Sequence, residues 1–378
     1  MYIVAASTAV LSMALGCAVG GPLMDRVGRK LAHLITCVFF ALGWFLLAGW
    51  PSLPVLYAGR FLTGLCVGII SPVSTVYIAE TAGPRTRGAL LAAVSFCIAL
   101  GVLLVHLLGA LLSWDRVSAI SACLPLACLV FIWRCPESPH WLHSVGRSRD
   151  AQRARAWFGV EHEEEVVVTL QKQDKARSGS FWKPFLLMCL FFLVQQCSGV
   201  NAVTFYTVQI LCEVGLPMDE YVATLLLDAV RLLFCTAACY LLRILDRRTL
   251  CAVSGLGTGA AMLALALVGN RFPGLPVVLL GCYVAFVSVG LVPLPWIMVG
   301  EVFPASRRGL GSGLSSCFGF LVFFMVVQTS PAMLAALDTD WTFAVYGLVS
   351  ILGTGLLLIW LPETRNKTLQ EIEEQLAR

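Results

Sequence analysis

Three closely spaced amide side chains, Gln195, Gln196 and Asn201, lie deep in the apolar run at residues 183–212. Each amide offers both hydrogen-bond donors and acceptors, which suits the hydroxyl groups of a sugar or polyol. Amides at membrane depth are costly unless they face a cavity or a partner. In a straight helix Asn201 would point away from both glutamines, so a break at Gly199 is needed to bring all three to one cavity. Hydrogen bonds between helices are the alternative role.

A second candidate element is the Pro-Leu-Pro-Trp sequence at 293–296. Pro293 and Pro295 remove backbone donors, so we expect the helix to unwind there. Trp296 stands beside this break and offers a flat apolar surface on which a sugar ring could stack. An anchoring role at the membrane interface is the alternative. Tyr206, which follows the amides, is a further candidate for sugar contact.

Charged signatures occur twice along the chain, in the same order. Glu80 and Glu301 lie 221 residues apart, and Glu137 and Glu363 lie 226 apart. The first copy comprises Arg26, Arg29, Glu80, Arg87 and Glu137, and the second comprises Arg247, Arg248, Glu301, Arg308 and Glu363. Such charges, placed where helices leave the membrane, could pair across helices and close one side of a transporter in one conformation. Simple anchoring of helix ends is the alternative.

The composition indicates the class of protein that must position these residues. Of 378 residues, 58% are hydrophobic and 13% are charged, whereas a soluble domain carries roughly 25% charged residues. Segments of about 20 apolar residues are long enough to span a bilayer. Eleven such segments are predicted: 2–24, 31–50, 54–79, 89–112, 116–134, 183–212, 221–243, 249–269, 275–299, 310–333 and 341–361. The predicted fold class is an all-α membrane protein embedded in the lipid bilayer.

The distribution of basic residues predicts the topology. Lysines and arginines gather in alternate connections, which the positive-inside rule places in the cytoplasm together with the C-terminus. The long polar stretch is expected to be a cytoplasmic linker of short helices between two transmembrane bundles. The predicted parts are an N-terminal bundle at 1–134, the linker at 135–182, a C-terminal bundle at 183–361 and a cytoplasmic tail at 362–378.

Several function classes find no support in the sequence. Fifteen cysteines occur with no CxxC pair, which favours packing roles over a metal site or a disulfide framework. A Walker motif is absent, which argues against a self-powered pump. The polar segments contain no grouping of a nucleophile with a general base, which argues against an enzyme. We therefore expect no cofactor, no metal and no nucleic-acid partner, and the sequence gives no indication of an oligomeric state.

The motifs together resemble the sugar porter family of the major facilitator superfamily, the facilitative hexose and trehalose transporters. The motifs that carry the resemblance are Asp25 to Lys30, Gly59-Arg60-Phe61, Glu80 to Gly88, Pro136 to Pro139, Gln195 to Ala202, Pro293 to Trp296 and Pro362-Glu363-Thr364. The resemblance implies two six-helix bundles with sugar bound between them. On that template this chain starts at the second helix, so its bundles would hold five and six helices.

The resemblance also assigns roles and shows departures. It implies that Gln195, Gln196, Asn201 and Trp296 contact sugar, and Ser95 is a further candidate because it stands at the position of a sugar-binding residue. The departures are Ser95 where relatives usually carry a sugar-binding glutamine, Arg231 where an asparagine is replaced or shifted, Ser288 in place of a glutamate or similar polar residue, Phe320 in place of a tryptophan and His140 in place of an arginine. These departures leave the identity of the sugar open.

Two charged residues lie inside one predicted span. Asp228 and Arg231 have i, i+3 spacing, so they could pair on one helix face, either lining a cavity or buried as a structural pair. His106, in another span, is expected to be a packing or lipid-interface residue.

Two hypotheses for function follow. The first is a uniporter that carries a hexose or trehalose-like sugar by alternating access, in the plasma membrane. The alternative is a truncated, transport-inactive product that binds sugar, senses it or assembles with full-length relatives.

Overall fold

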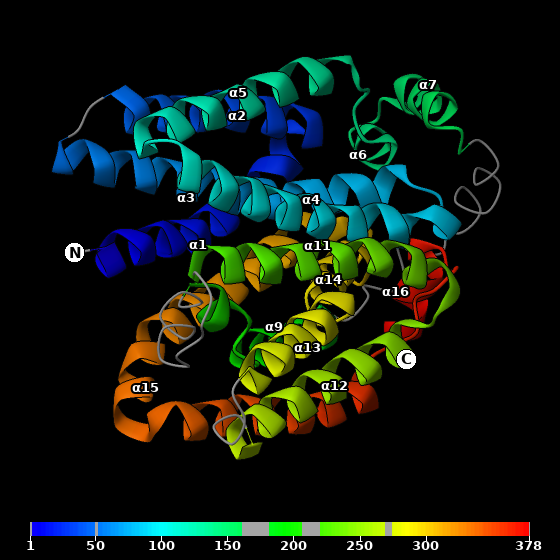
Figure 1. The fold of residues 1–378 in the computed structure, drawn as a ribbon. Coiled ribbons are helices and arrows are strands. Elements are labelled where there is room, and N and C mark those ends of the chain that lie inside the picture. Colours follow the sequence, from blue (N-terminus) through cyan, green and yellow to red (C-terminus); the bar gives the residue numbers. More distant parts are fainter. Residues whose placement is uncertain (1, 50–51, 161–180, 206–219, 269–273, 378) are drawn as a thin grey trace.

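The computed structural model describes residues 2–49, 52–160, 181–205, 220–268 and 274–377, and every regular element in these ranges is helical (Figure 1). The helices of the first half are α1 (Tyr2–Val27), α2 (Arg29–Gly49), α3 (Leu53–Thr81), α4 (Pro84–Leu111) and α5 (Trp114–Arg134), followed by the short α6 (Pro139–Ser144) and α7 (Ser148–Phe158). The second half contains α9 (Trp182–Cys197), α11 (Glu220–Ile244), α12 (Arg247–Val268), α13 (Leu275–Val289), α14 (Pro293–Glu301), η3 (Ala305–Arg307), α15 (Arg308–Trp360) and α16 (Leu369–Ala377).

Nine helices of the described residues are long and apolar enough to cross a membrane. A helix suits the hydrocarbon interior of a membrane because it satisfies its backbone hydrogen bonds internally. The longest, α15, doubles back near Asp338, whose φ of 59° is non-helical. Ser330 Oγ and the Tyr346 hydroxyl lie 2.9 Å apart, whereas a straight helix would separate them by about 24 Å. The two arms of α15 therefore correspond to the predicted spans 310–333 and 341–361.

The helices form two halves that face each other, as expected for the predicted all-α membrane fold (Figure 1). Within the first half α1 packs on α3, and α2 packs on α3 and α5. Across the halves, α1 packs on α15 and α4 packs on α11. The short helices α6, α7 and α16 lie together at the end of the molecule opposite the N-terminus. We call this the charged end, because it holds Arg29, Glu80, Arg247, Glu301 and Arg308.

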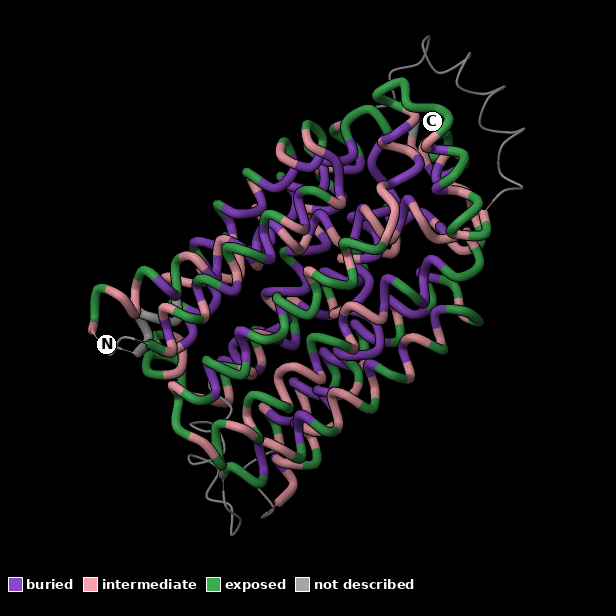
Figure 2. The backbone as a smooth tube through the Cα atoms, turned by 90° about the horizontal axis from the view of Figure 1, so that it is seen from above, coloured by how far each residue is buried: buried purple, intermediate pink, exposed green. Residues whose placement is uncertain are grey.

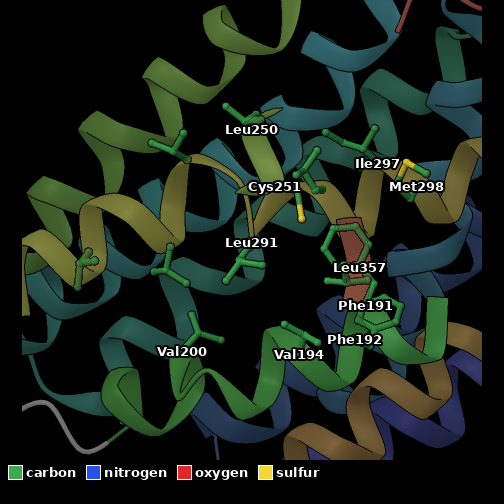
Figure 3. Packing of buried hydrophobic residues seen from close by; sticks show 14 of the residues in the cluster. Phe191, Phe192, Val194, Val200, Leu250, Cys251, Leu291, Ile297, Met298 and Leu357 are labelled. Carbon is green, nitrogen blue, oxygen red and sulfur yellow. The ribbon is translucent and has the colours of Figure 1, made fainter. Parts of the chain in front are cut away.

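Burial follows the helix faces rather than the hydrophobicity of the residues. Buried positions line the contacts between helices, and exposed positions lie on the outside (Figure 2). Many exposed side chains are large and apolar, among them Phe131 and Trp133 on α5. Such a surface is unfavourable in water and suits lipid tails. In the second half, the core joins α9, α12, α14 and α15 through residues such as Phe191, Cys251 and Leu357 (Figure 3).

The predicted linker lies between two long helices of the structure. Helix α5 ends at Arg134 and α9 begins at Trp182, and α6 and α7 occupy the stretch between them. Residues 161–180 of this linker are outside the described residues.

Candidate functional site

A cavity of about 300 Å³ lies between the two halves, a volume in the range of small-molecule sites. Helices α1, α3 and α4 line it on one side, and α9, α11, α14 and α15 on the other. Five of the residues predicted to bind sugar line this cavity: Ser95, Gln195, Gln196, Asn201 and Trp296. Tyr206 lies outside the described residues.

A helix break brings the three amides to one cavity. Helix α9 ends at Cys197, and helical conformation resumes at residue 200. Between them Gly199 has a φ of 85°, in the left-handed region that glycine adopts at low cost. The Tyr346 ring packs so closely that a Cβ on Gly199 would lie 2.8 Å from it. Past the break, Asn201 Nδ2 donates a hydrogen bond to Gln196 Oε1.

A second break opens the backbone opposite the amides. Helix α13 ends at Val289 and α14 begins at Pro293. The Ser254 hydroxyl satisfies groups freed at this break, since it accepts from the Leu291 N–H at 2.8 Å and donates to the Phe286 carbonyl at 2.6 Å. The break also supplies a carbonyl to the site, because Gln195 Nε2 donates to the Val292 oxygen at 3.1 Å.

Trp296 stands at the start of α14, just after this second break. Its ring centroid is 5.1 Å from that of Phe192 and 5.7 Å from that of Phe320. Such tilted and edge-to-face contacts hold an aromatic ring in place. Because Trp296 and Phe320 both line the cavity, they give it an aromatic part of the wall.

Two polar atoms of the cavity residues have no hydrogen-bond partner among the residues that the structure describes. These are Ser95 Oγ and Gln195 Oε1, and both are buried. An unsatisfied buried polar group costs about 1–3 kcal/mol, so a water molecule or a ligand hydroxyl at these atoms would be stabilising. The arrangement of amides, a hydroxyl and an aromatic wall is one that can bind a polyhydroxylated ring.

The charged residues predicted within one span have separate partners. Asp228 Oδ2 lies 2.5 Å from His106 Nδ1 on the facing helix α4, and Arg231 Nη2 donates to Thr204 Oγ1 at 2.7 Å. The expected pairing of Asp228 with Arg231 is thus wrong, because the imidazole of α4 lies within reach of the carboxylate. The same contact gives His106 a charged partner, which its predicted packing role did not include. Arg231 lines the cavity.

The charged end repeats one arrangement in both halves. In the first half, Arg29 Nη2 donates to Glu80 Oε1 at 2.9 Å, and the Ser138 hydroxyl donates to Glu80 Oε2 at 2.6 Å. In the second half, Arg247 Nη2 lies 3.7 Å from Glu301 Oε1, and the Thr364 hydroxyl donates to Glu301 Oε2 at 2.7 Å.

The remaining glutamates of the duplicated signatures also have equivalent positions. Glu137 accepts the backbone N–H of Arg29 at 3.0 Å, and Glu363 accepts that of Arg248 at 3.3 Å. Each glutamate therefore holds the first turn of a helix, α2 in one half and α12 in the other. This contact also favours a negative charge at the positive end of each helix dipole.

Contacts between the halves close the charged end. Arg308 Nη1 of α15 lies 3.3 Å from Glu80 Oε1 of α3, and Arg87 Nη1 donates to the Lys367 carbonyl at 3.2 Å. Helices α1 and α15 approach so closely that a Cβ on Gly21 would lie 2.5 Å from the Gly309 oxygen. Arg26 is exposed and has no ion pair with a described residue. The first-half arginine that pairs with Glu80 is therefore Arg29, and the gating role predicted for Arg26 finds no supporting ion pair in the described part of the chain.

His140 of α6 borders this network, next to Glu80, Arg87 and Arg155. The pKa of its imidazole is lowered to about 4, chiefly by burial; Glu80 opposes this shift, and the nearby guanidinium groups of Arg308, Arg155 and Arg87 add to it. His140 is therefore neutral at pH 7 and adds no charge to the closed end.

Some cavity residues carry no signal that sequence reasoning could use. Met13, Val67, Ser71 and Thr75 line the wall from α1 and α3, but such residues are common in any membrane helix. Ser71 and Thr75 donate to carbonyls of their own helix. Within the described ranges, no group of three His, Cys, Asp or Glu side chains is arranged to hold a metal ion.

Comparison with known families and proteins gives consistent matches over the whole chain. The family model "Sugar (and other) transporter" matches residues 1–376. The "Facilitated trehalose transporter Tret1" of Bombyx mori is 31% identical, over 97% of this chain and 77% of that protein. The "Facilitated trehalose transporter Tret1-2 homolog" of Drosophila sechellia is 32% identical, over 94% of this chain and 78% of that protein.

Solved structures are similar in fold. The major facilitator superfamily proton:xylose symporter XylE, bound to 6-bromo-6-deoxy-D-glucose, superposes with a TM-score of 0.85 at 23% sequence identity. The match covers 98% of this chain and 88% of that one. At this identity the likeness concerns the arrangement of the helices.

Proposed function

Because the chain belongs to the sugar transporter family of the major facilitator superfamily, we propose that its sugar binds in the cavity between the two halves. The chain is an integral membrane protein that carries sugar by facilitated transport, and it is not an enzyme. The comparisons favour transport over the alternative of an inactive partner. The proposed substrate is a hexose or trehalose-like sugar, the latter because the relatives are named trehalose transporters.

One observation carries the assignment of the site: Gln195, Gln196 and Asn201 converge on one cavity with Trp296. In the proposed complex the amides donate to and accept from sugar hydroxyls, and the indole covers an apolar face of the ring. Ser95 Oγ and Gln195 Oε1, which have no partner in the described part of the chain, gain one from the sugar. Ser95 belongs to the first half and Gln195 to the second, so a bound sugar would draw the halves together.

The charged end is proposed to act as the gate. While Arg308 and Glu80 remain paired, the halves are joined on that side, and parting of this pair would open the cavity there. Rocking of one half against the other around a fixed site is the general scheme of such carriers. We propose residues 1–134 and 183–361 as the moving bundles, with 135–182 as linker and 362–378 as tail.

The charged end is also proposed to lie in the cytosol. Basic residues of both halves gather there, and positive charge favours the cytoplasmic side. The C-terminal helix α16 lies at the same end, so the C-terminus would be cytoplasmic. The plasma membrane is the proposed location, as suits a carrier that exchanges sugar between the cell and its surroundings.

Flux into proteoliposomes tests this function. The purified chain should produce saturable uptake of labelled hexose or trehalose that stops when inside and outside concentrations are equal. An internal load of unlabelled sugar should accelerate entry, and ATP or a proton gradient should have no effect. Uptake no faster than into protein-free vesicles would contradict transport, and accumulation that requires a proton gradient would contradict the uniport mechanism.

A further inference from the structure

Arg231 is the one charged side chain among the described residues that line the cavity. It reaches the cavity from α11, and its Nη2 atom donates to the Thr204 hydroxyl at 2.7 Å. The other polar lining groups, Ser95 and the three amides among them, are neutral. The part of the wall that the structure describes therefore bears one positive charge and contains no carboxylate.

The acidic residue nearest to Arg231 in the sequence forms no ion pair with it and is bonded to another residue. Asp228 precedes it by one turn of α11, but the Asp228 carboxylate is bonded to His106 of α4. Asp228 is buried, with 5% of its surface exposed, and it is not among the residues that line the cavity. Within the described residues, Arg231 forms a hydrogen bond to a neutral hydroxyl and no ion pair.

An arginine without a carboxylate partner is unusual for a site that binds a neutral ring. Charge inside a membrane protein is costly unless it is paired. A neutral sugar can accept hydrogen bonds from a guanidinium, but it leaves the positive charge in place. A carboxylate accepts hydrogen bonds from the guanidinium and also neutralises its charge, because the planar fork of arginine matches the two carboxylate oxygens.

We propose that this site prefers a sugar acid, meaning a monosaccharide that bears one carboxylate. The carboxylate would lie on Arg231, the hydroxyls on Gln195 and Gln196, and the ring against Trp296. This inference rests on the proposed function, since it concerns the same cavity. It makes Arg231 the residue that selects for charge, while the amides and the indole recognise the sugar ring.

The proposal has an electrical consequence. A uniporter that moves a sugar monoanion moves one negative charge, so the membrane potential adds to the driving force. At equilibrium about 59 mV of inside-positive potential should accumulate the anion about tenfold, the ratio expected for one charge. A neutral sugar carried by the same protein should show no accumulation.

The test uses the full chain in proteoliposomes with labelled D-glucuronate and D-glucose, which differ only at the sixth carbon. A potassium gradient with valinomycin sets the potential. We expect glucuronate entry to exceed glucose entry in kcat/KM by at least about tenfold, a ratio within reach of one charge-assisted contact, and to depend on the potential. Arg231→Gln, which keeps an amide donor but removes the charge, should abolish that preference, and Arg231→Lys should preserve part of it.

Arg60→Gln is the matched control, because Arg60 is another arginine inside a predicted span, and its own side chain does not line the cavity. Its ratio of glucuronate to glucose uptake should equal that of the wild type. Glucose transport without glucuronate transport would overturn this inference and leave the proposed function intact, whereas transport of neither sugar would count against both. An equal loss of both substrates in Arg231→Gln, with Arg231→Lys no better, would also overturn the selective role.

Discussion

Arg308 Nη1 on the second half lies 3.3 Å from Glu80 Oε1 on the first half. Both side chains are 2% exposed, and Glu80 also accepts from Arg29 of its own half at 2.9 Å. One buried carboxylate is therefore shared by a guanidinium of each half. In the proposed opening of the charged end, Glu80 would keep Arg29 and lose Arg308, so the network would break in one defined place.

Removing the charge of Glu80 should open the charged end. Glu80→Gln leaves Arg29 and Arg308 buried beside a neutral group, and breaking a buried ion pair in this way costs about 3–5 kcal/mol. We expect faster amide hydrogen exchange at residues 302–309. Glu301→Gln is the matched control, because Glu301 contacts Arg247 and Thr364 within its own half. Equal acceleration of exchange in both variants would argue that the Arg308–Glu80 pair does not hold the halves together.

Filling the contact between α1 and α15 should prevent closure. A Cβ on Gly21 would lie 2.5 Å from the Gly309 oxygen, so Gly21→Val forces the helices apart at the charged end. Overpacking costs about 1–3 kcal/mol, and sugar counterflow should fall by roughly tenfold. Gly101→Val on α4 meets no atom within 4 Å and should transport normally. A normal rate in Gly21→Val would show that closure does not require this close approach.

The break after α9 should depend on glycine. Gly199→Ala places a Cβ at a φ of 85°, which costs about 1–2 kcal/mol for a residue with a side chain, and brings it 2.8 Å from the Tyr346 ring. The melting temperature of the purified protein should fall by roughly 2–4 °C. Gly281→Ala, where no atom lies within 4 Å, should not lower it. Equal melting temperatures for the two variants would refute the requirement.

The stability of the protein should decrease in acid because of His140. Its pKa is about 4 in the folded state against roughly 6.5 for an unperturbed histidine. The unfolded chain therefore takes up a proton below about pH 6.5 that the folded protein does not, and stability falls until about pH 4. His140→Gln removes this contribution, so its melting temperature should fall less than that of the wild type between pH 7 and 4.5. Parallel curves would exclude His140 as the source.

The sequence predicts the elements of the charged end better than their individual contacts. The duplicated glutamates are visible because charge is rare in such a chain and must lie where helices leave the membrane. The choice of Arg29 over Arg26 depends on the rotation of the chain around Gly28, where α1 gives way to α2. A turn of the helix decides which arginine faces Glu80, and spacing alone does not fix that rotation.

For the cavity, too, the sequence predicts the main residues but not their individual contacts. The amides and Trp296 are conspicuous in an apolar sequence, and the need to satisfy them predicts a common cavity. The pairing of Asp228 with His106 joins residues 122 positions apart, and it depends on how α4 packs on α11. Met13 and Val67 line the wall through their position alone, so their chemistry gives no signal.

Sugar counterflow into proteoliposomes containing Gln196→Ala is the most direct test of the cavity as the sugar site. Gln328→Ala is the matched control, because Gln328 is an exposed glutamine of α15 outside the cavity. Gln196→Ala should lower kcat/KM for the transported sugar by about tenfold or more, since it removes a buried hydrogen-bonding partner, while Gln328→Ala should equal the wild type. Undiminished counterflow in Gln196→Ala would contradict the assignment of this cavity as the sugar site.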